Sequence, residues 1–147
     1  MYNVAFVSEA LVRKVKIQAA LRKMSADALL LADNANLYYT SGRVFCGYTY
    51  VPAEGDMIYF VRRPVGLTGD NCVYIHKPEQ IPGEMQKRGL SMPATLMLEG
   101  DSLSFNEYNR LASVFSTSRI LGGGTALIRR VRAVKTPYEM ELIRQSA

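Results

Sequence analysis

Along the 147-residue chain, segments whose apolar residues recur at helical spacing alternate with short apolar runs that resemble strands. Apolar residues three and four apart indicate amphipathic helices at residues 9–24, 104–115 and 125–134. Between them lie short runs rich in apolar, β-branched and aromatic residues, which are typical of strands. The predicted strands are residues 26–32, 44–51, 57–61, 71–76, 94–98 and 118–121. This alternation predicts the α/β class, with helices on the faces of a mixed sheet.

Local signals refine this order. The short, glycine-containing stretch 52–56 lies between two predicted strands, which should form one antiparallel hairpin in an otherwise partly parallel sheet. Residues 37–42 are predicted to be one helical turn that Gly42 ends in a left-handed conformation. Residues 79–88 are predicted to be a short helix interrupted near Pro82 and Gly83.

The first helix is expected to turn its apolar side to the core and its basic side to solvent. The expected apolar side includes Leu11, Val12, Val15, Ala19 and Leu21. Basic residues, Arg13 and Lys14 among them, lie on the expected solvent side. The sequence therefore predicts an amphipathic helix with a basic outer surface.

The last stretch of the sequence predicts a helix with a strong start signal. Thr136 is the expected N-cap, Pro137 the first helical residue, and Glu139 the side chain that reaches back to the cap. One apolar face of this helix is formed by Met140, Ile143 and Ala147. The predicted domain leaves that face uncovered. We therefore expect residues 1–132 to form one domain, and residues 133–147 to be the linker and first helix of an absent C-terminal domain.

Two motifs give the chain a family resemblance. The junction motif consists of Lys135, Thr136, Pro137, Glu139, Met140, Ile143 and Arg144. The Asn-Tyr motif, Asn-x-x-Tyr-x-Ser-Gly, spans residues 36–42. Both resemble the creatinase, prolidase and aminopeptidase P family, in which a small N-terminal domain precedes a pita-bread catalytic domain. The resemblance implies the fold of that N-terminal domain, a mixed, ribonuclease H-like sheet with helices on its faces.

The resemblance also implies a function for the parent protein, an Xaa-Pro aminopeptidase or Xaa-Pro dipeptidase acting on peptides with proline at the second position. Family members bind two divalent metal ions, manganese or cobalt, in the catalytic domain. Those ligands would lie beyond Ala147, so no catalytic or metal-binding residue is assigned here. The N-terminal domain is expected to be non-catalytic. Its expected roles are assembly of a homodimer or higher homo-oligomer and substrate gating, with its own catalytic domain as a further partner.

Other classes of function stay open. A free-standing binding or assembly module would need no catalytic domain. A creatinase-like amidinohydrolase, or another member of the superfamily, would use the same N-terminal domain for a different reaction. A reading frame that continues past Ala147 into an aspartate-rich metal motif would favour the peptidase.

The aromatic hairpin is the predicted gate. Family members lend a loop from this region to the active site of a neighbouring subunit, and the candidate gating residues here are Tyr48, Tyr50 and Arg43. Creatinase-like members place an aromatic and a basic residue at about this point, whereas the two matching positions here are both tyrosine. The alternative is that the aromatic residues only pack the hairpin onto helices, which we favour for Tyr59 and Phe60.

Composition narrows the possible classes of function further. Hydrophobic residues make up 48% of the chain and charged residues 21%, as in globular proteins. The net charge of +5 comes from scattered basic residues, which favours a solvated surface over a nucleic-acid site. The sequence has no apolar run that could cross a bilayer and no signal-peptide pattern at its start. Nucleic acid and membrane are therefore not expected partners, and the cytoplasm is the expected location.

Few other residues suggest chemistry. Cys46 and Cys72 are expected to be small buried residues, and a zinc site with His76 is disfavoured because no fourth ligand clusters with them. His76 by itself is expected to be packed or half-exposed. Glycines 122–124 lack the spacing of a phosphate loop, so a plain turn is expected. Four carboxylates lie at predicted strand ends: Asp27, Asp33, Glu99 and Asp101. Capping or turn roles explain Asp33 and Asp101.

Overall fold

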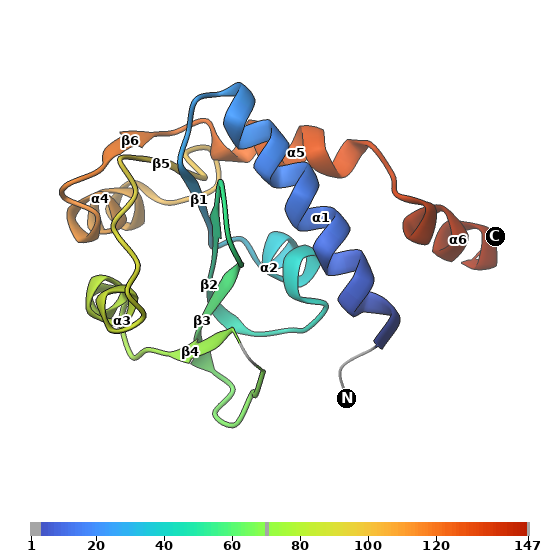
Figure 1. The fold of residues 1–147 in the computed structure, drawn as a ribbon, viewed down its shortest axis with the longest axis horizontal. Helices are drawn as coiled ribbons and strands as arrows, with labels where there is room; N and C mark the ends of the chain where they lie inside the picture. Colours follow the sequence, from blue (N-terminus) through green and yellow to red (C-terminus); the bar gives the residue numbers. More distant parts are fainter. Residues whose placement is uncertain (1–3, 70, 147) are drawn as a thin grey trace.

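The computed structural model describes residues 4–69 and 71–146, whose six strands form one mixed sheet (Figure 1). The strands are β1 (Ala28–Leu31), β2 (Cys46–Pro52), β3 (Ile58–Arg63), β4 (Cys72–Tyr74), β5 (Thr95–Leu98) and β6 (Arg119–Leu121). Their order across the sheet is β4-β3-β2-β1-β5-β6. β2 and β3 form the predicted antiparallel hairpin, β2 also pairs antiparallel with β1, and the other neighbours are parallel.

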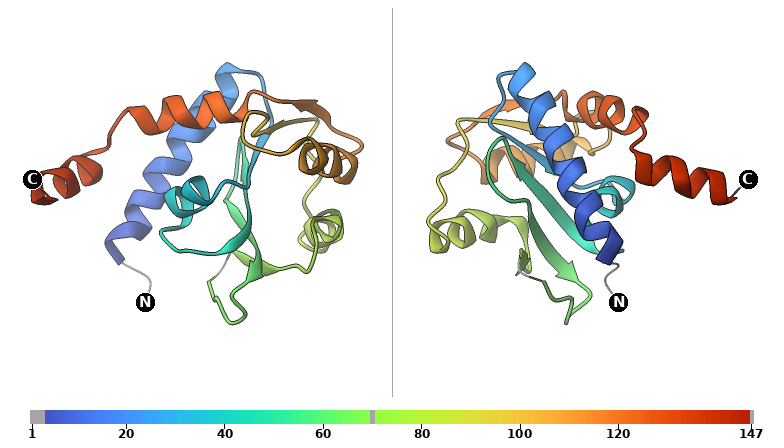
Figure 2. Two further views of the ribbon diagram at one scale, coloured as in Figure 1. Left: turned by 180° about the vertical axis from the view of Figure 1, so that it is seen from behind. Right: turned by 45° about the vertical axis from the view of Figure 1, so that its right-hand side comes forward.

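Helices cover both faces of this sheet (Figures 1 and 2). They are α1 (Val4–Lys23), α2 (Asn34–Ser41), α3 (Ile81–Lys87), α4 (Phe105–Val114), α5 (Gly124–Ala133) and α6 (Pro137–Ser146), with the 3₁₀ turn η1 (Pro78–Gln80) before α3. The first face carries α1, α2 and α5, and the second face carries α3 and α4. The predicted α/β class is confirmed. None of these described helices is long and apolar enough to span a membrane.

β1 lies between the two helical layers, which explains its continuous apolar sequence. Successive side chains of a strand point to opposite faces. Leu29 and Leu31 therefore pack in the core of the first face, whereas Leu30 packs in the core of the second. Tyr59 and Phe60 of β3 divide in the same way, and both are buried as predicted.

α1 turns a different side to the core than the sequence predicts. Leu11 and Val15, expected inside, are about half exposed, whereas Arg13, expected in solvent, is buried. The buried side runs through Arg13, Ile17 and Leu21 at helical spacing, and of these Leu21 belongs to the predicted apolar side. Apolar residues lie on more than one side of this helix, and the choice between sides depends on partners for Arg13 that come from distant segments.

Two other helices differ from prediction in detail. α2 has eight residues rather than one turn, and Gly42 ends it in the predicted left-handed conformation with φ of 71°. A Cβ at Gly42 would lie 2.7 Å from the Phe6 ring, so α1 packs closely on this turn. The predicted interruption near Pro82 and Gly83 is wrong. Pro82 lies in the first turn of α3, where its missing N–H breaks no helical hydrogen bond.

α6 extends away from the sheet and its helical layers (Figures 1 and 2). None of its described residues is buried. Met140 and Ile143 are each about half exposed, and Ala147, expected on the same face, lies outside the described residues. The apolar side of this helix is therefore uncovered, as the sequence predicts.

Candidate functional site: the junction before α6

α2, which carries the Asn-Tyr motif, is joined to the end of α5, shortly before the junction motif. Asn36 and Tyr39 of the Asn-Tyr motif lie on α2, and both contact Arg132 of α5. Nη1 of Arg132 donates to Oδ1 of Asn36 at 2.9 Å, and the guanidinium carbon lies 5.3 Å from the centre of the Tyr39 ring. Segments 96 residues apart in sequence are thereby joined next to the start of α6.

Arg13 of α1 is the centre of this junction. Its side chain donates to the Glu9 carboxylate at 2.8 Å, to the Tyr39 carbonyl oxygen at 2.6 Å and to the Glu139 carboxylate at 3.2 Å. Three rings surround its guanidinium carbon, those of Phe6 (4.8 Å to the ring centre), Tyr39 (4.3 Å) and Tyr138 (6.0 Å). Arg13 is only 6% exposed, so its charge is compensated within the protein rather than by water.

The N-cap of α6 is bonded into the same group of residues. Oγ1 of Thr136 accepts the Glu139 N–H at 3.2 Å, and the Glu139 carboxylate accepts the Thr136 N–H at 2.8 Å, which confirms the predicted capping box. The Thr136 hydroxyl also donates to the Glu9 carboxylate at 2.7 Å. The start of α6 is therefore held directly against α1, a contact that a capping box alone does not predict.

Glu99, which follows β5, holds the start of α2. It is fully buried, and its carboxylate accepts hydrogen bonds from the N–H groups of Ala32 (2.6 Å) and Asp33 (2.9 Å) and from Nδ2 of Asn36 (2.6 Å). A negative charge at a helix N-terminus is stabilised by the helix dipole. Asp33 occupies the N-cap position, but its side chain makes no cap hydrogen bond, so the predicted capping role belongs to Glu99 instead. Asp101 lies in a turn, as expected.

The Tyr39 hydroxyl is an exception in this otherwise bonded group. It is buried and has no hydrogen-bond partner among the described residues. Burial, together with the negative charge of Glu139, raises the pKa of Tyr39 to about 12, so the hydroxyl stays neutral. Its aromatic ring, rather than its hydroxyl, makes the observed contacts with the two arginines.

We call this group the junction cluster. It consists of Glu9, Arg13, Asn36, Tyr39, Glu99, Arg132, Thr136 and Glu139. Each charged member is hydrogen-bonded to another member, and the chain of contacts runs from β5 through α2 to α5, α1 and α6. Directional bonds of this kind hold in one arrangement only, so the cluster is suited to fixing the direction in which α6 leaves the domain.

The structure separates the three predicted gate residues. Tyr48 and Tyr50 are 3% and 4% exposed and lie on the sheet face covered by α3 and α4. The guanidinium carbon of Arg62 lies 6.0 Å from the centre of the Tyr48 ring, and burial raises the pKa of Tyr48. Arg43 donates to the backbone of the loop before β4 and lines a cavity with residues of α1. The two tyrosines therefore lie together, apart from Arg43, and their gating role stays a prediction.

The remaining candidate residues lie apart from the junction cluster. The predicted burial of the cysteines is wrong, since Cys46 is exposed beside an irregularity in the pairing of β2 with β3, and Cys72 is half-buried. His76 is exposed beyond the end of β4. Within the described residues, no group of three or more His, Cys, Asp or Glu side chains could hold a metal ion. Gly124 begins α5 so close to β5 that a Cβ would lie 2.7 Å from a backbone oxygen.

Comparison with known families shows to which family this sequence belongs. The sequence model of the creatinase/prolidase N-terminal domain matches residues 13–134. The chain therefore belongs to the creatinase/prolidase N-terminal domain family. A search of curated proteins finds no match. The matched range includes Arg13, the Asn-Tyr motif and Arg132, so most of the junction cluster lies within it.

Solved structures similar to this chain have the same fold. The Xaa-Pro dipeptidase from Bacillus anthracis gives a TM-score of 0.70 at 15% identity, over 92% of this chain and 39% of that one. The N-terminal domain of the cytoplasmic peptidase PepQ from Mycobacterium tuberculosis gives 0.63 at 18% identity, over 79% and 98%. The prolidase from Pyrococcus horikoshii gives 0.61 at 21% identity, over 90% and 38%. This chain spans about two fifths of the dipeptidase and the prolidase.

Proposed function

We propose that this chain is the non-catalytic N-terminal domain of a cytoplasmic, metal-dependent Xaa-Pro peptidase. The observation that carries the proposal is the junction cluster, because it holds the start of α6 while the apolar side of that helix is left uncovered. A C-terminal catalytic domain is the partner that would cover Met140 and Ile143. In this proposal the two divalent ions, manganese or cobalt, are bound by the catalytic domain.

The test uses the gene product extended past residue 147. It is assayed with manganese on an Xaa-Pro dipeptide and on a longer peptide with proline at the second position. We expect turnover of at least one of them by the extended protein and none by the 147-residue chain. If the extended protein turns over neither peptide, the peptidase proposal is rejected and a free-standing binding or assembly module is favoured.

We also propose that α1 contributes to assembly with a second copy of the protein. Val7, Leu11 and Val15 follow one another at four-residue spacing on this helix, and all three are about half exposed. Sedimentation velocity of Leu11→Glu should show a smaller assembly than the unmodified protein. Phe105→Glu is the matched control, because Phe105 is an exposed apolar residue on α4. An unchanged assembly in the Leu11 variant would exclude this role for α1.

Substrate gating by Tyr48, Tyr50 and Arg43 is proposed as a separate role. In the extended protein we expect Tyr48→Phe, Tyr50→Phe or Arg43→Met to change kcat/KM without changing the size of the assembly. Tyr59→Phe is the control, because Tyr59 lies on the opposite face of the sheet. Unchanged kcat/KM values in all three variants would remove the hairpin from the substrate path.

A further inference from the structure

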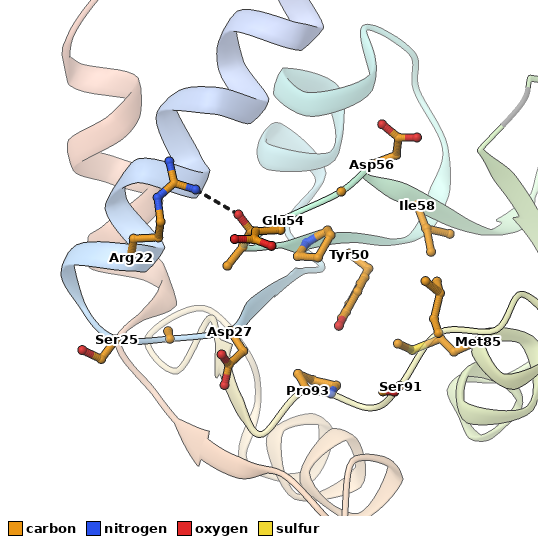
Figure 3. Close-up of a pocket in the computed structure, with 15 residues that line it drawn as sticks. Arg22, Ser25, Asp27, Tyr50, Glu54, Asp56, Ile58, Met85, Ser91 and Pro93 are labelled. Carbon is orange, nitrogen blue, oxygen red and sulfur yellow. Dashed lines mark hydrogen bonds between the residues drawn. The ribbon is translucent and has the colours of Figure 1, made fainter.

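A cavity of about 710 Å³ opens at the edge of the sheet where β1 and β5 begin and β2 ends (Figure 3). This volume is typical of sites that hold small molecules or peptide ends. Its walls come from the turn between α1 and β1, from β2 and the hairpin turn, and from α3 and the segment that follows it. None of its lining residues belongs to the junction cluster.

The floor of the cavity combines apolar surface with the hydroxyl of Tyr50. Ile58, Met85 and the Tyr50 ring provide apolar surface, and the Tyr50 ring also stacks on Phe115 with 6.5 Å between ring centres. Figure 3 shows the Tyr50 side chain pointing from β2 toward Pro93, on the far side of the cavity. Tyr50 is 4% exposed, and the described residues offer its hydroxyl no hydrogen-bond partner. A ligand oxygen in the cavity would satisfy it.

The rim of the cavity is acidic in a chain whose net charge is +5. Asp27 and Glu54 line the opening, and neither has an ion-pair partner among the described residues. One oxygen of Asp27 accepts the Thr95 N–H at 2.9 Å, which holds the carboxylate in place and leaves its second oxygen for a ligand. Arg22, the basic residue of the lining, donates to a backbone carbonyl oxygen at 3.1 Å, the dashed bond in Figure 3. A cation is therefore the charge that this rim favours.

The floor of the cavity indicates which other groups the cationic ligand should carry. Burial and the negative charge of Asp27 raise the pKa of Tyr50, so its hydroxyl stays protonated and can donate a hydrogen bond. A ligand carboxylate in that place would be repelled by Asp27, whereas a neutral carbonyl oxygen would not. The apolar floor adds a place for a hydrophobic side chain.

We propose that this cavity binds a protonated α-amine with a neutral carbonyl beside it and an apolar side chain, as at the amino terminus of a peptide. The ammonium group lies against Asp27 and Glu54, the carbonyl oxygen accepts from Tyr50, and the apolar side chain contacts Ile58 and Met85. This site needs neither a metal ion nor the catalytic domain, so its test is independent of the peptidase proposal.

Three matched probes test the proposal by NMR titration of the ¹⁵N-labelled 147-residue chain at about pH 6.5, where an α-amino group is protonated. Leucinamide has the full chemistry, N-acetylleucinamide lacks the cation, and leucine carries a carboxylate instead of the neutral amide. We expect saturable shifts for the amides of Asp27, Glu54 and Ser91 with leucinamide, at a Kd of about 1 mM or below. The other two probes should bind about tenfold more weakly. Equal binding of all three, or no saturable shift with leucinamide, would overturn the proposal.

Variants then assign the recognition to residues. Asp27→Asn keeps an oxygen for the Thr95 N–H but removes the charge, and should weaken leucinamide binding about tenfold. Tyr50→Phe keeps the stacked ring and should weaken it about fivefold. Glu141→Gln, a neutralised carboxylate on the outlying α6, is the control and should bind as the unmodified chain does. Unchanged affinity in the Asp27 and Tyr50 variants, with their spectra still those of the folded chain, would contradict this site.

Discussion

The two faces of the sheet are held by different kinds of interaction. Under α1, α2 and α5, the buried polar junction cluster lies beside an apolar core. Under α3 and α4 the core is apolar, and the ion pair between Glu79 and Arg110 lies at the surface, with each side chain 43% exposed. Both faces bury large apolar side chains, so hydrophobic burial is common to them and the charged groups distinguish them.

This difference separates stability from geometry. Apolar contacts stabilise roughly in proportion to the area buried, and they tolerate small rearrangements. Hydrogen-bonded charges in a buried cluster tolerate few such rearrangements, because a displaced partner leaves a charge uncompensated. The first face carries the cluster and also carries α6, whose direction the cluster is suited to fix. The second face closes the core and provides Met85 to the cavity.

Replacement of Arg13, on the first face, should have the largest effect on the free energy of unfolding. Arg13→Ala leaves the buried Glu9 carboxylate without its cation and removes the contacts with three rings. We expect the free energy of unfolding to fall by about 3–5 kcal/mol. Urea denaturation at neutral pH measures this change, and hydrogen exchange of the α6 amides should become faster in the same variant.

The control for Arg13→Ala is a replacement on the other face of the sheet. Arg110→Ala breaks the surface pair with Glu79 and should have a small effect, because water and salt screen exposed charges. Arg13→Lys keeps the charge but loses the planar guanidinium, so its effect should lie between the two. Equal losses from Arg13→Ala and Arg110→Ala would mean that the two faces do not differ as described.

Replacement of Glu99 should have the next largest effect. Glu99→Gln keeps the size of the side chain but turns an amide nitrogen toward one of three hydrogen-bond donors. We expect a loss of about 2 kcal/mol in the free energy of unfolding. Asp101→Asn is the control because Asp101 is exposed two residues further along the chain. A Glu99 variant as stable as the Asp101 variant would exclude Glu99 as the anchor of α2.

Much of the fold could be predicted because its signals are local. The capping box of Thr136 with Glu139 needs only a few consecutive residues, and it is observed. The hairpin follows from a short turn between two strand-like runs, and the left-handed Gly42 from its place at a helix end. Each of these features is determined within about ten residues of chain.

The junction cluster could not be predicted in the same way. Glu9 and Arg13 are four residues apart and resemble an ordinary surface pair on a helix, yet both are buried, because Tyr39 and Thr136 cover them from distant segments. Glu99 gave the same signal as any carboxylate after a strand. The cavity is likewise formed by segments far apart in sequence, so no single stretch marks Tyr50 as part of its floor.

Two tyrosine hydroxyls offer a finer comparison. The Tyr39 hydroxyl is buried without a partner, whereas the Tyr59 hydroxyl donates to the Thr40 carbonyl oxygen at 2.8 Å. Tyr39→Phe keeps the ring against Arg13, so the free energy of unfolding should stay unchanged or rise by about 1 kcal/mol. Tyr59→Phe should lower it by about 1–2 kcal/mol. Urea denaturation compares the two, and a larger loss for the Tyr39 variant would point to a hydroxyl partner beyond the contacts described.

The surface pair on the second face should give the smallest effect, and one that depends on pH. Hydrogen bonds from Arg110 lower the pKa of Glu79 to about 2, below its ordinary value of 4.5. A lowered pKa in the folded state stabilises the fold above the unfolded value, and this contribution is lost as the pH falls toward the folded value. The small stability difference between the unmodified chain and Glu79→Gln should therefore be present at pH 7 and shrink between about pH 4.5 and pH 2. A double-mutant cycle with Arg110→Gln at both ends of that range isolates the pair, and a coupling that persists at the acid end would show that charge is not its source.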